Sequence, residues 1–352
     1  MSTDVGHDVA SLLTIVVTSS PVPSNPDTST MQAVFRSFAL VPGLLRCPKI
    51  IQLDGPQRSL PQLRIRSYSE FARRIRTMSR ADAAFANTRV FANERFLFAS
   101  HNLAAAISHV NTSFLFSCQH DYLLARPFDL SGLLRTMISI PVVRHVRLNM
   151  RPNYPPRGFD GVIENATLPG LLVPLSRTCG WSDAPHIASV SYYRKFVIPQ
   201  NEHDHFGGKR KFMEESIHYP MQRNGMPGGC WETKQQLKKG IRPVVWPKNF
   251  DMYGTYLYGF ASATDGNYMV HRSLRGKEPQ WGHGHELFVG GHKPLATRVP
   301  GGATAAGDPA RKTAKGAAQR PGHGVGASAN NRKGGDRGRH AGRSRRGRKS
   351  QP

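Results

Sequence analysis

The feature that most constrains this chain is an alternation of short apolar runs with helical apolar faces over its first half. The runs are rich in β-branched and aromatic residues, which is typical of buried strands, and lie at 12–17, 48–53, 112–118 and 143–148. Between them, apolar residues recur three and four positions apart, which is typical of amphipathic helices. Strands that alternate with helices form a mostly parallel sheet with helices on both faces. The sequence therefore predicts an α/β protein.

Four helices are expected between these strands, each with one face of large apolar side chains. Their faces are Met31, Val34, Phe35 and Phe38; Tyr68, Phe71, Ile75 and Met78; Phe96, Leu103, Ile107 and Val110; Leu130, Leu133, Leu134, Met137 and Ile138. Asp129 is the predicted N-cap of the last of these helices. The second carries Arg73, Arg74 and Arg76 on its solvent side, and residues 63–66 before it are a candidate third strand.

The signal weakens after Arg151, where proline and glycine become frequent and periodicity fades. Short helices are expected at 189–196 and 211–219, and a hairpin is expected from 253–259 and 268–271. This half is predicted to be an irregular extension of the same domain. The four cysteines form no CxxC pair, so the spacing indicates no disulfide framework.

Charge is concentrated at the C-terminus of a chain of 352 residues whose formal net charge is +25. Residues 291–352 are dominated by Gly, Ala, Arg, Lys and Ser, which cannot bury enough apolar surface to offset the entropy of ordering. We expect a disordered N-terminus at 1–10, one domain at 11–290, and a disordered basic tail at 291–352. A tail of this composition is suited to nucleic acid or another anionic surface, or it is only solubilising.

No stretch approaches the roughly 18–20 apolar residues that a membrane helix needs. The run at 12–17 is short and follows two acidic residues, Asp4 and Asp8, so it makes a poor signal peptide. The sequence therefore predicts no transmembrane segment and favours a cytoplasmic protein.

Polar residues follow the predicted strands directly. Asp54 ends the second strand, Gln119, His120 and Asp121 end the central one, and Arg151 follows the run at 143–148. In open α/β sheets, ligands bind outside the carboxyl ends of the parallel strands. The sequence therefore predicts a ligand site that these residues share.

Several segments together resemble glycosyltransferase-like proteins of the GT-A fold, the nucleotide-diphospho-sugar transferases similar to family 2. The segments are Phe114-Leu-Phe-Ser-Cys-Gln-His-Asp121, Arg126-Pro-Phe-Asp129, Val146-Arg-Leu-Asn149, Trp181-Ser-Asp-Ala-Pro-His186 and Tyr193-Arg194. Thr14-Ile-Val-Val-Thr18 and Ile50-Ile-Gln-Leu-Asp-Gly55 look like the first two strands of that fold. The resemblance covers about 11–275 and implies a Rossmann-like sheet.

The resemblance implies a nucleotide-sugar donor and a divalent metal, Mn²⁺ or Mg²⁺. Asp54 occupies the place of the acidic nucleoside contact, and Gln119-His120-Asp121 occupies the place of the Asp-x-Asp metal motif, with only the second acid present. Gln119, His120 and Arg151 are the further candidates for holding the donor, and the metal candidates are Asp121 and His271.

The transfer also needs a carboxylate that accepts the acceptor's proton. Glu214, Glu215 and Asp183 are the candidates for this catalytic base. Each candidate also has a purely structural interpretation. Asp183 could form an Asx turn before Pro185. The two glutamates could lie on a solvated helix face.

The other candidates have equally plain alternatives. Asp54 could serve only the Asp-Gly turn, and Asp121 could be a helix cap or a surface turn. Arg151 could be a surface cation, and His271 a structural strand histidine.

Two functions remain at this stage. The favoured one is a glycosyltransferase that moves a sugar from a nucleotide-diphosphate donor to a hydroxyl of a glycan, lipid or protein acceptor. The alternative is a non-catalytic GT-A-like protein that binds nucleic acid or anionic partners through its basic surface and tail.

Overall fold

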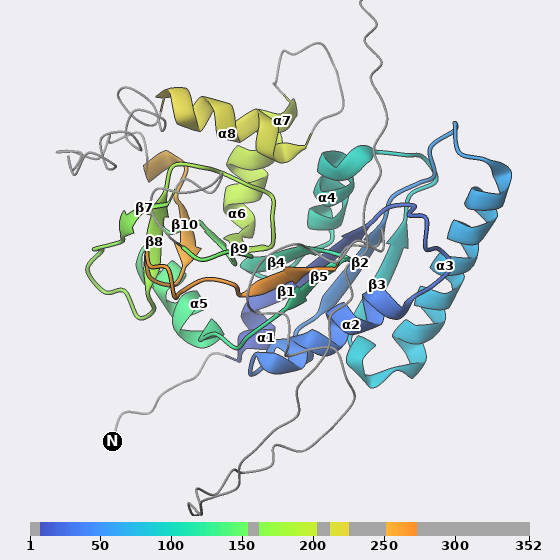
Figure 1. Cartoon of the computed structure of the whole chain (residues 1–352), viewed down its shortest axis with the longest axis horizontal. Helices are drawn as coiled ribbons and strands as arrows, with labels where there is room; N and C mark the ends of the chain where they lie inside the picture. The colour runs from blue at the N-terminus through green and yellow to red at the C-terminus, as the bar shows by residue number, and fades with distance from the viewer. Residues whose placement is uncertain (1–7, 154–161, 203–211, 225–250, 273–352) are drawn as a thin grey trace, which may run out of the picture. The chain divides into compact units, whose positions relative to one another are not determined.

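The computed structural model describes residues 8–153, 162–202, 212–224 and 251–272 (Figure 1). In this part of the chain a nine-stranded sheet has the order β3-β2-β1-β4-β9-β6-β10-β8-β7. Its strands are β1 (Leu13–Ser19), β2 (Lys49–Leu53), β3 (Thr88–Ala92), β4 (Phe114–Gln119), β6 (His145–Arg147), β7 (Val162–Asn165), β8 (Leu175–Thr178), β9 (His186–Ser189) and β10 (Thr255–Tyr258). The expected α/β class is confirmed.

Strand direction confirms a mostly parallel sheet. The ladders β3-β2, β2-β1, β1-β4 and β6-β10 are parallel, and those that involve β8 or β9 are antiparallel. Every strand of this sheet except β8 and β9 therefore runs in the same direction. This arrangement is consistent with the GT-A-like fold that the sequence resemblance implies.

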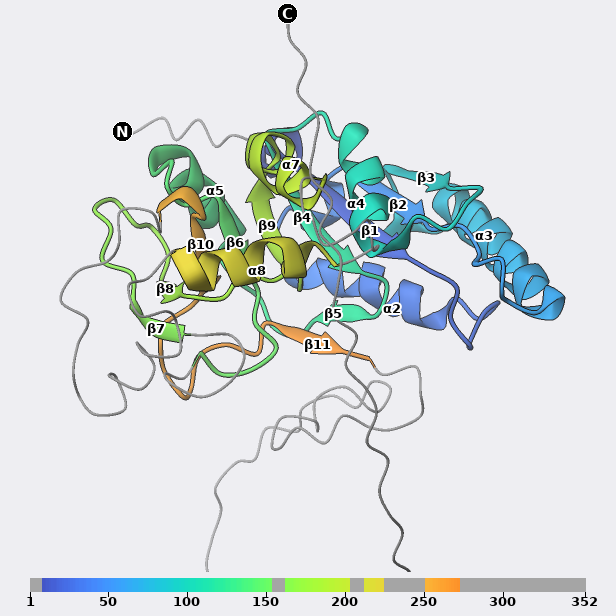
Figure 2. The same ribbon diagram turned by 90° about the horizontal axis from the view of Figure 1, so that it is seen from above.

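Helices cover both faces of the sheet (Figures 1 and 2). One face carries α1 (Val9–Leu12), α2 (Ser29–Ser37), α3 (Gln62–Ala81), α5 (Leu130–Ser139) and the short helical turns η1 (Phe38–Leu40), η2 (Leu44–Arg46) and η3 (Ala83–Phe85). The other carries α4 (Phe98–Ser108), α6 (Val190–Tyr192), the π-helical turn η4 (Tyr193–Val197), α7 (Ile198–Glu202) and α8 (Met213–Asn224). The sheet therefore separates two hydrophobic cores.

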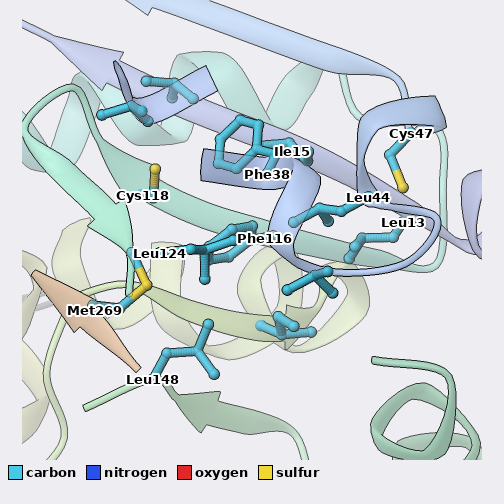
Figure 3. Packing of buried hydrophobic residues seen from close by; sticks show 14 of the residues in the cluster. Leu13, Ile15, Phe38, Leu44, Cys47, Phe116, Cys118, Leu124, Leu148 and Met269 are labelled. Atoms are coloured by element: carbon cyan, nitrogen blue, oxygen red, sulfur yellow. The ribbon is translucent and has the colours of Figure 1, made fainter. Parts of the chain in front are cut away.

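The side chains of β1 explain why its sequence is apolar throughout. Leu13, Ile15 and Val17 pack in the first core, whereas Val16 packs in the second. Successive side chains of a strand point to opposite faces, so a strand covered on both faces needs apolar residues at every position. Figure 3 shows the first core, where Ile15 lies close to Phe38 and Phe116.

A second, two-stranded sheet pairs β5 (Tyr122–Leu124) with β11 (Met269–His271) in antiparallel register, with His271 opposite Tyr122 (Figure 2). The expected hairpin of 253–259 with 268–271 is therefore wrong. Its first strand joins the main sheet as β10 and its second pairs with β5. Residues of similar β propensity cannot identify their partners from sequence alone.

Two further expectations need correction. Residues 63–66 are not a strand but the start of α3, and the third strand is β3 instead. β3 lies at the edge of the sheet and is half-buried, so its apolar signal is weak. Among the described cysteines, Cys47 and Cys118 are free, whereas Cys179 is disulfide-bonded, which no spacing in the sequence indicated.

No described helix is both long and apolar enough to cross a membrane. The predicted tail at 291–352 lies outside the described residues, as do residues 1–7 of the predicted N-terminal segment at 1–10. The predicted N-cap of α5 is confirmed, because the Gly132 N–H donates to Asp129 Oδ1 at 2.8 Å.

This cap makes a stability prediction. Asp129→Ala removes the acceptor of the Gly132 N–H and should lower the free energy of unfolding by about 1 kcal/mol, whereas Asp129→Asn should retain most of it. Urea unfolding of the full-length variants measures the difference. Equal losses for the alanine and asparagine variants would show that the hydrogen bond contributes nothing.

Candidate active site

The candidate residues gather at one edge of the main sheet because of strand direction. β1, β2, β4, β6 and β10 all end at this edge, so Asp54 and Gln119-His120-Asp121 lie along it. β9 runs the other way between β4 and β6, so it begins at this edge. Residues 181–185 precede β9 and are therefore brought to the same edge as the end of β4.

Asp121 and His271, the two predicted metal ligands, are hydrogen-bonded to each other. His271 Nε2 lies 3.0 Å from Asp121 Oδ2, and the Arg272 N–H donates to the Asp121 carbonyl at 2.8 Å. The β5–β11 register produces this contact, because it sets His271 opposite Tyr122, the neighbour of Asp121. The second carboxylate oxygen, Asp121 Oδ1, is buried and has no hydrogen-bond partner among the described residues.

Electrostatics favours opposite charges on this pair. Burial acts to raise the pKa of Asp121, but the hydrogen bond from His271 and the nearby imidazoles outweigh it and lower the pKa. The hydrogen bond to Asp121 raises the pKa of His271 in spite of partial burial. A carboxylate oxygen is a ligand that Mn²⁺ and Mg²⁺ prefer, and the orphaned Oδ1 atom is such an oxygen. His271 could ligate a metal only in its neutral form.

His120 and Gln119 line the same strand end. The His120 N–H donates to the Thr18 carbonyl at 3.0 Å, and Gln119 is the last residue of β4, opposite Thr18 of β1. His120 is buried, and its Nε2 has no hydrogen-bond partner in the described part of the chain. Burial lowers the pKa of His120, so the imidazole is predominantly neutral at pH 7.

Two of the three predicted base candidates form a carboxyl pair. Ser182 Oγ donates to Glu214 Oε2 at 3.0 Å, whereas Glu214 Oε1 is buried and has no hydrogen-bond partner among the described residues. Burial first, and then the charge of Glu214, raise the pKa of Asp183 to about 7. Two carboxyl groups this close cannot both ionise freely, so one retains a proton near neutral pH. Glu215, by contrast, is exposed.

Tyr122 connects the two pairs and was not singled out by sequence reasoning. Its ring lies 4.8 Å from the His271 ring, centroid to centroid. Burial raises the pKa of Tyr122 to about 12, and the negative charges of Asp121, Asp183 and Glu214 add to that increase. The Tyr122 hydroxyl therefore lies close enough to both pairs to be affected by their charges. It stays protonated at neutral pH and can donate a hydrogen bond.

The loop that carries Asp183 is held by buried histidines. His218 Nδ1 lies 2.9 Å from the Trp181 carbonyl, and His186 Nδ1 lies 2.7 Å from the Ala184 carbonyl. Because a carbonyl only accepts, both imidazoles donate through Nδ1. Burial lowers the pKa of His186 to about 4, which keeps it neutral, and its Nε2 accepts from the Tyr193 hydroxyl at 2.6 Å.

His218 lies four residues after Glu214 on α8, on the same side of the helix. Glu214 accepts a hydrogen bond from the Ser182 hydroxyl and His218 donates to the adjacent carbonyl of Trp181. The face of α8 that carries Glu214 and His218 is therefore attached to two neighbouring residues of this loop, Ser182 and Trp181. These contacts set the position of Glu214 relative to Asp183.

Asp54 has a structural role. Its carboxylate accepts hydrogen bonds from the backbone N–H groups of Gly55, Leu97 and Phe98 at 2.8, 2.7 and 3.0 Å. Burial raises its pKa, against the effect of these three bonds. Phe98 has φ +71°, which non-glycine residues seldom adopt, so Asp54 holds the strained first residue of α4 against the sheet edge.

Gly55 is required at this point, since a Cβ atom there would lie 2.2 Å from the Arg95 carbonyl carbon. Arg151 lies elsewhere along the edge, where its backbone carbonyl accepts from the Asn267 N–H at 3.3 Å. The structure therefore brings together Asp121, His271, Asp183 and Glu214. It does not show a direct contact between Arg151 or Asp54 and those four.

Within the described ranges, no group of three or more His, Cys, Asp or Glu side chains could hold a metal ion. A metal at Asp121 and His271 would therefore take its remaining ligands from a bound ligand and water, as Mg²⁺ commonly does.

Comparison with known proteins finds little. No protein-family model matches, and neither does any curated protein. Among solved structures the chain is similar to S. aureus TarS, with a TM-score of 0.35, 12% identity, and coverage of 52% of this chain and 29% of that chain. TarS 1-349 in complex with UDP gives a TM-score of 0.34, 12% identity, and coverage of 52% and 48%.

The complex of TarS 1-349 with UDP-GlcNAc gives a TM-score of 0.33, 12% identity, and coverage of 52% and 47%. The chain thus spans less than half the length of these TarS chains. A likeness of this size carries no functional conclusion.

The hydrogen bond between His218 and the Trp181 carbonyl predicts that replacing His218 changes how the free energy of unfolding depends on pH. Because the folded-state pKa of Asp183 is raised to about 7, its contribution to stability is complete below the ordinary pKa of 3.8 and is lost as pH rises through 7. His218→Leu frees α8 from the loop, so Asp183 should titrate closer to its ordinary value. The fall in unfolding free energy between pH 5 and 8 should then shrink by about 1 kcal/mol.

Urea unfolding at the two pH values measures this difference. His218→Asn is the matched control, because its amide can donate from nearly the position of Nδ1 and should preserve the pH dependence. An equal loss of stability at both pH values in the leucine variant would mean that His218 only packs the helix and does not position the pair.

Proposed function

We propose that the protein is a glycosyltransferase that transfers a sugar from a nucleotide-diphosphate donor to an acceptor hydroxyl. The observation that carries this proposal is the convergence of a carboxylate–imidazole pair, Asp121–His271, and a carboxyl pair, Asp183–Glu214, around Tyr122 at the carboxyl edge of the sheet. One pair is suited to a metal ion and the other to proton transfer, and sugar transfer needs both.

Donor binding is assigned to the end of β4 and its neighbours. Asp121, through its orphaned Oδ1, and His271 would hold Mn²⁺ or Mg²⁺, and the ion when bound neutralises charge on the leaving diphosphate. His120 and Gln119 lie beside this position, and Arg151 supplies a cation at the same edge. Asp54 defines the nucleoside side through the loop at 95–98 that its carboxylate holds.

Proton transfer is assigned to the Asp183–Glu214 pair. As the acceptor oxygen bonds to the anomeric carbon, the bond from that carbon to the diphosphate oxygen breaks, and the acceptor proton passes to the ionised carboxylate of the pair. A base whose pKa lies near the working pH combines a large ionised fraction with a strong drive for proton transfer. The pKa of Asp183, about 7, meets that condition.

Nucleotide binding tests the donor half of the proposal. UDP, GDP and CDP, each with and without Mn²⁺, are added to the full-length protein, and thermal unfolding is followed. One nucleotide should raise the melting temperature only with Mn²⁺, since a ligand at about 100 times its Kd adds about 2.7 kcal/mol. Asp121→Ala should abolish the increase.

Glu70→Gln is the control, because Glu70 lies on α3 and pairs only with Arg73 and Arg74 there. A shift that is unchanged in Asp121→Ala would contradict the metal assignment. No shift with any nucleotide would contradict donor binding and favour a non-catalytic protein.

The base assignment is tested by adjacent glutamates. Glu214→Gln should lower kcat by about 100-fold, whereas Glu215→Gln, at an exposed position, should change it by less than about threefold. Because the charge of Glu214 raises the pKa of Asp183, removing it should also move the ascending limb of the pH–rate profile to lower pH. Equal effects of the two substitutions, or an unmoved limb, would contradict the assignment.

A further inference from the structure

The outer face of α3 is an arginine surface that the proposed catalysis does not use. The helix spans 20 residues and contains six arginines, no lysine and a single acid, Glu70. Its inner face, which includes Tyr68, Phe71 and Ile75, is buried in the first core. Since the apolar face is fully used within the protein, the charged face has no role in folding that requires this density of arginine.

The arginines form a row along the helix. Arg66, Arg73 and Arg80 are seven residues apart, so they succeed one another at intervals of about 10.5 Å along the axis on one side. All three are exposed, as is Arg76 close to the same line.

Some arginines of α3 already have a partner within the protein, and the others do not. Glu70 accepts hydrogen bonds from Arg73 at 2.7 and 2.8 Å and from Arg74 at 2.8 Å, and these bonds lower the pKa of Glu70 to about 2. Arg64 donates to the Pro23 carbonyl at 2.9 Å. The side chains of Arg66, Arg76 and Arg80 have no hydrogen-bond or ion-pair partner among the described residues.

The arginine side chains of this surface favour phosphate esters as ligands. Guanidinium groups bind phosphate in a bidentate manner, and a row of them without lysine favours phosphate over a diffuse anionic partner. Single-stranded nucleic acid needs exposed aromatic side chains for base stacking, and the only aromatic residues of α3, Tyr68 and Phe71, are buried. A row of cations along one side of a 20-residue helix instead matches the flat array of phosphates at a bilayer surface.

We propose that the outer face of α3 docks on an anionic phospholipid bilayer, with Arg66, Arg76 and Arg80 on the headgroup phosphates. The helix does not insert as a whole, because its apolar face stays in the core. Docking is peripheral and electrostatic, so it weakens as ionic strength rises. It is independent of the transferase proposal.

Sedimentation with vesicles tests this proposal on the full-length protein. Vesicles of phosphatidylcholine alone are compared with vesicles that contain phosphatidylglycerol. Each cation close to an anionic surface contributes roughly a fivefold gain in binding, so the variant Arg66→Gln/Arg76→Gln/Arg80→Gln should bind the anionic vesicles about 100-fold more weakly.

A charge-matched variant separates this face from general basicity. Arg95→Gln/Arg135→Gln/Lys195→Gln removes three exposed cations that lie on no part of α3, and should bind nearly as the unmodified protein does. Equal losses in the two triple variants would overturn the proposal. A loss confined to the binding of a single-stranded RNA oligonucleotide, with vesicle binding unchanged, would overturn it in favour of nucleic acid.

Discussion

The structure depends on one strand that runs against the direction of its neighbours. β9 lies between β4 and β6 and is antiparallel to both, with His186 opposite Ser117 on one side and Arg147 on the other. If β9 were parallel, residues 181–185 would lie at the amino edge of the sheet, far from Asp121. Because it is antiparallel, Asp183 reaches the edge where β4 ends. α8 then attaches to this segment through Glu214 and His218.

The charges at this edge oppose the charge of the molecule as a whole. The chain carries a formal net charge of +25, yet Asp121, Asp183 and Glu214 all act on the pKa of one half-buried tyrosine, Tyr122. Concentrating carboxylates costs free energy, and the molecule limits that cost in two ways. Asp121 is paired with His271, and the Asp183–Glu214 pair keeps a proton near neutral pH. Groups that are perturbed in this way are typical of functional sites.

The elements of this fold that could be predicted from the sequence are those with a local signal, and the others depend on contacts between distant segments of the chain. The buried strands at 12–17, 48–53 and 112–118 were predicted because a strand covered on both faces is apolar at every position, which is a local signal. The helix at 62–81 was only partly identified, because the alternation of apolar and basic residues at 63–66 looked like a strand. The antiparallel strands β8 and β9 and the pairing of β11 with β5 depend on distant partners, and no local pattern encodes them.

The residues of the candidate site also include some that could be predicted from the sequence and others that could not. Asp121 and His271 were selected through resemblance to a family, and the structure shows that their side chains are in contact. Tyr122 and His218 were missed, since their proximity to the acids follows from strand register and from the packing of α8. Glu214 could not be preferred over Glu215 from sequence, because only the docked helix shows which of the two faces Asp183.

The most direct test of the account is a crystal structure of the protein with Mn²⁺ and the nucleotide that stabilises it, with data collected for the anomalous scattering of manganese. The account predicts one strong anomalous peak within coordination distance of Asp121 Oδ1 and His271 Nε2, with the diphosphate on its open side. A nucleotide bound without manganese at this position, or a manganese peak away from Asp121, would contradict it.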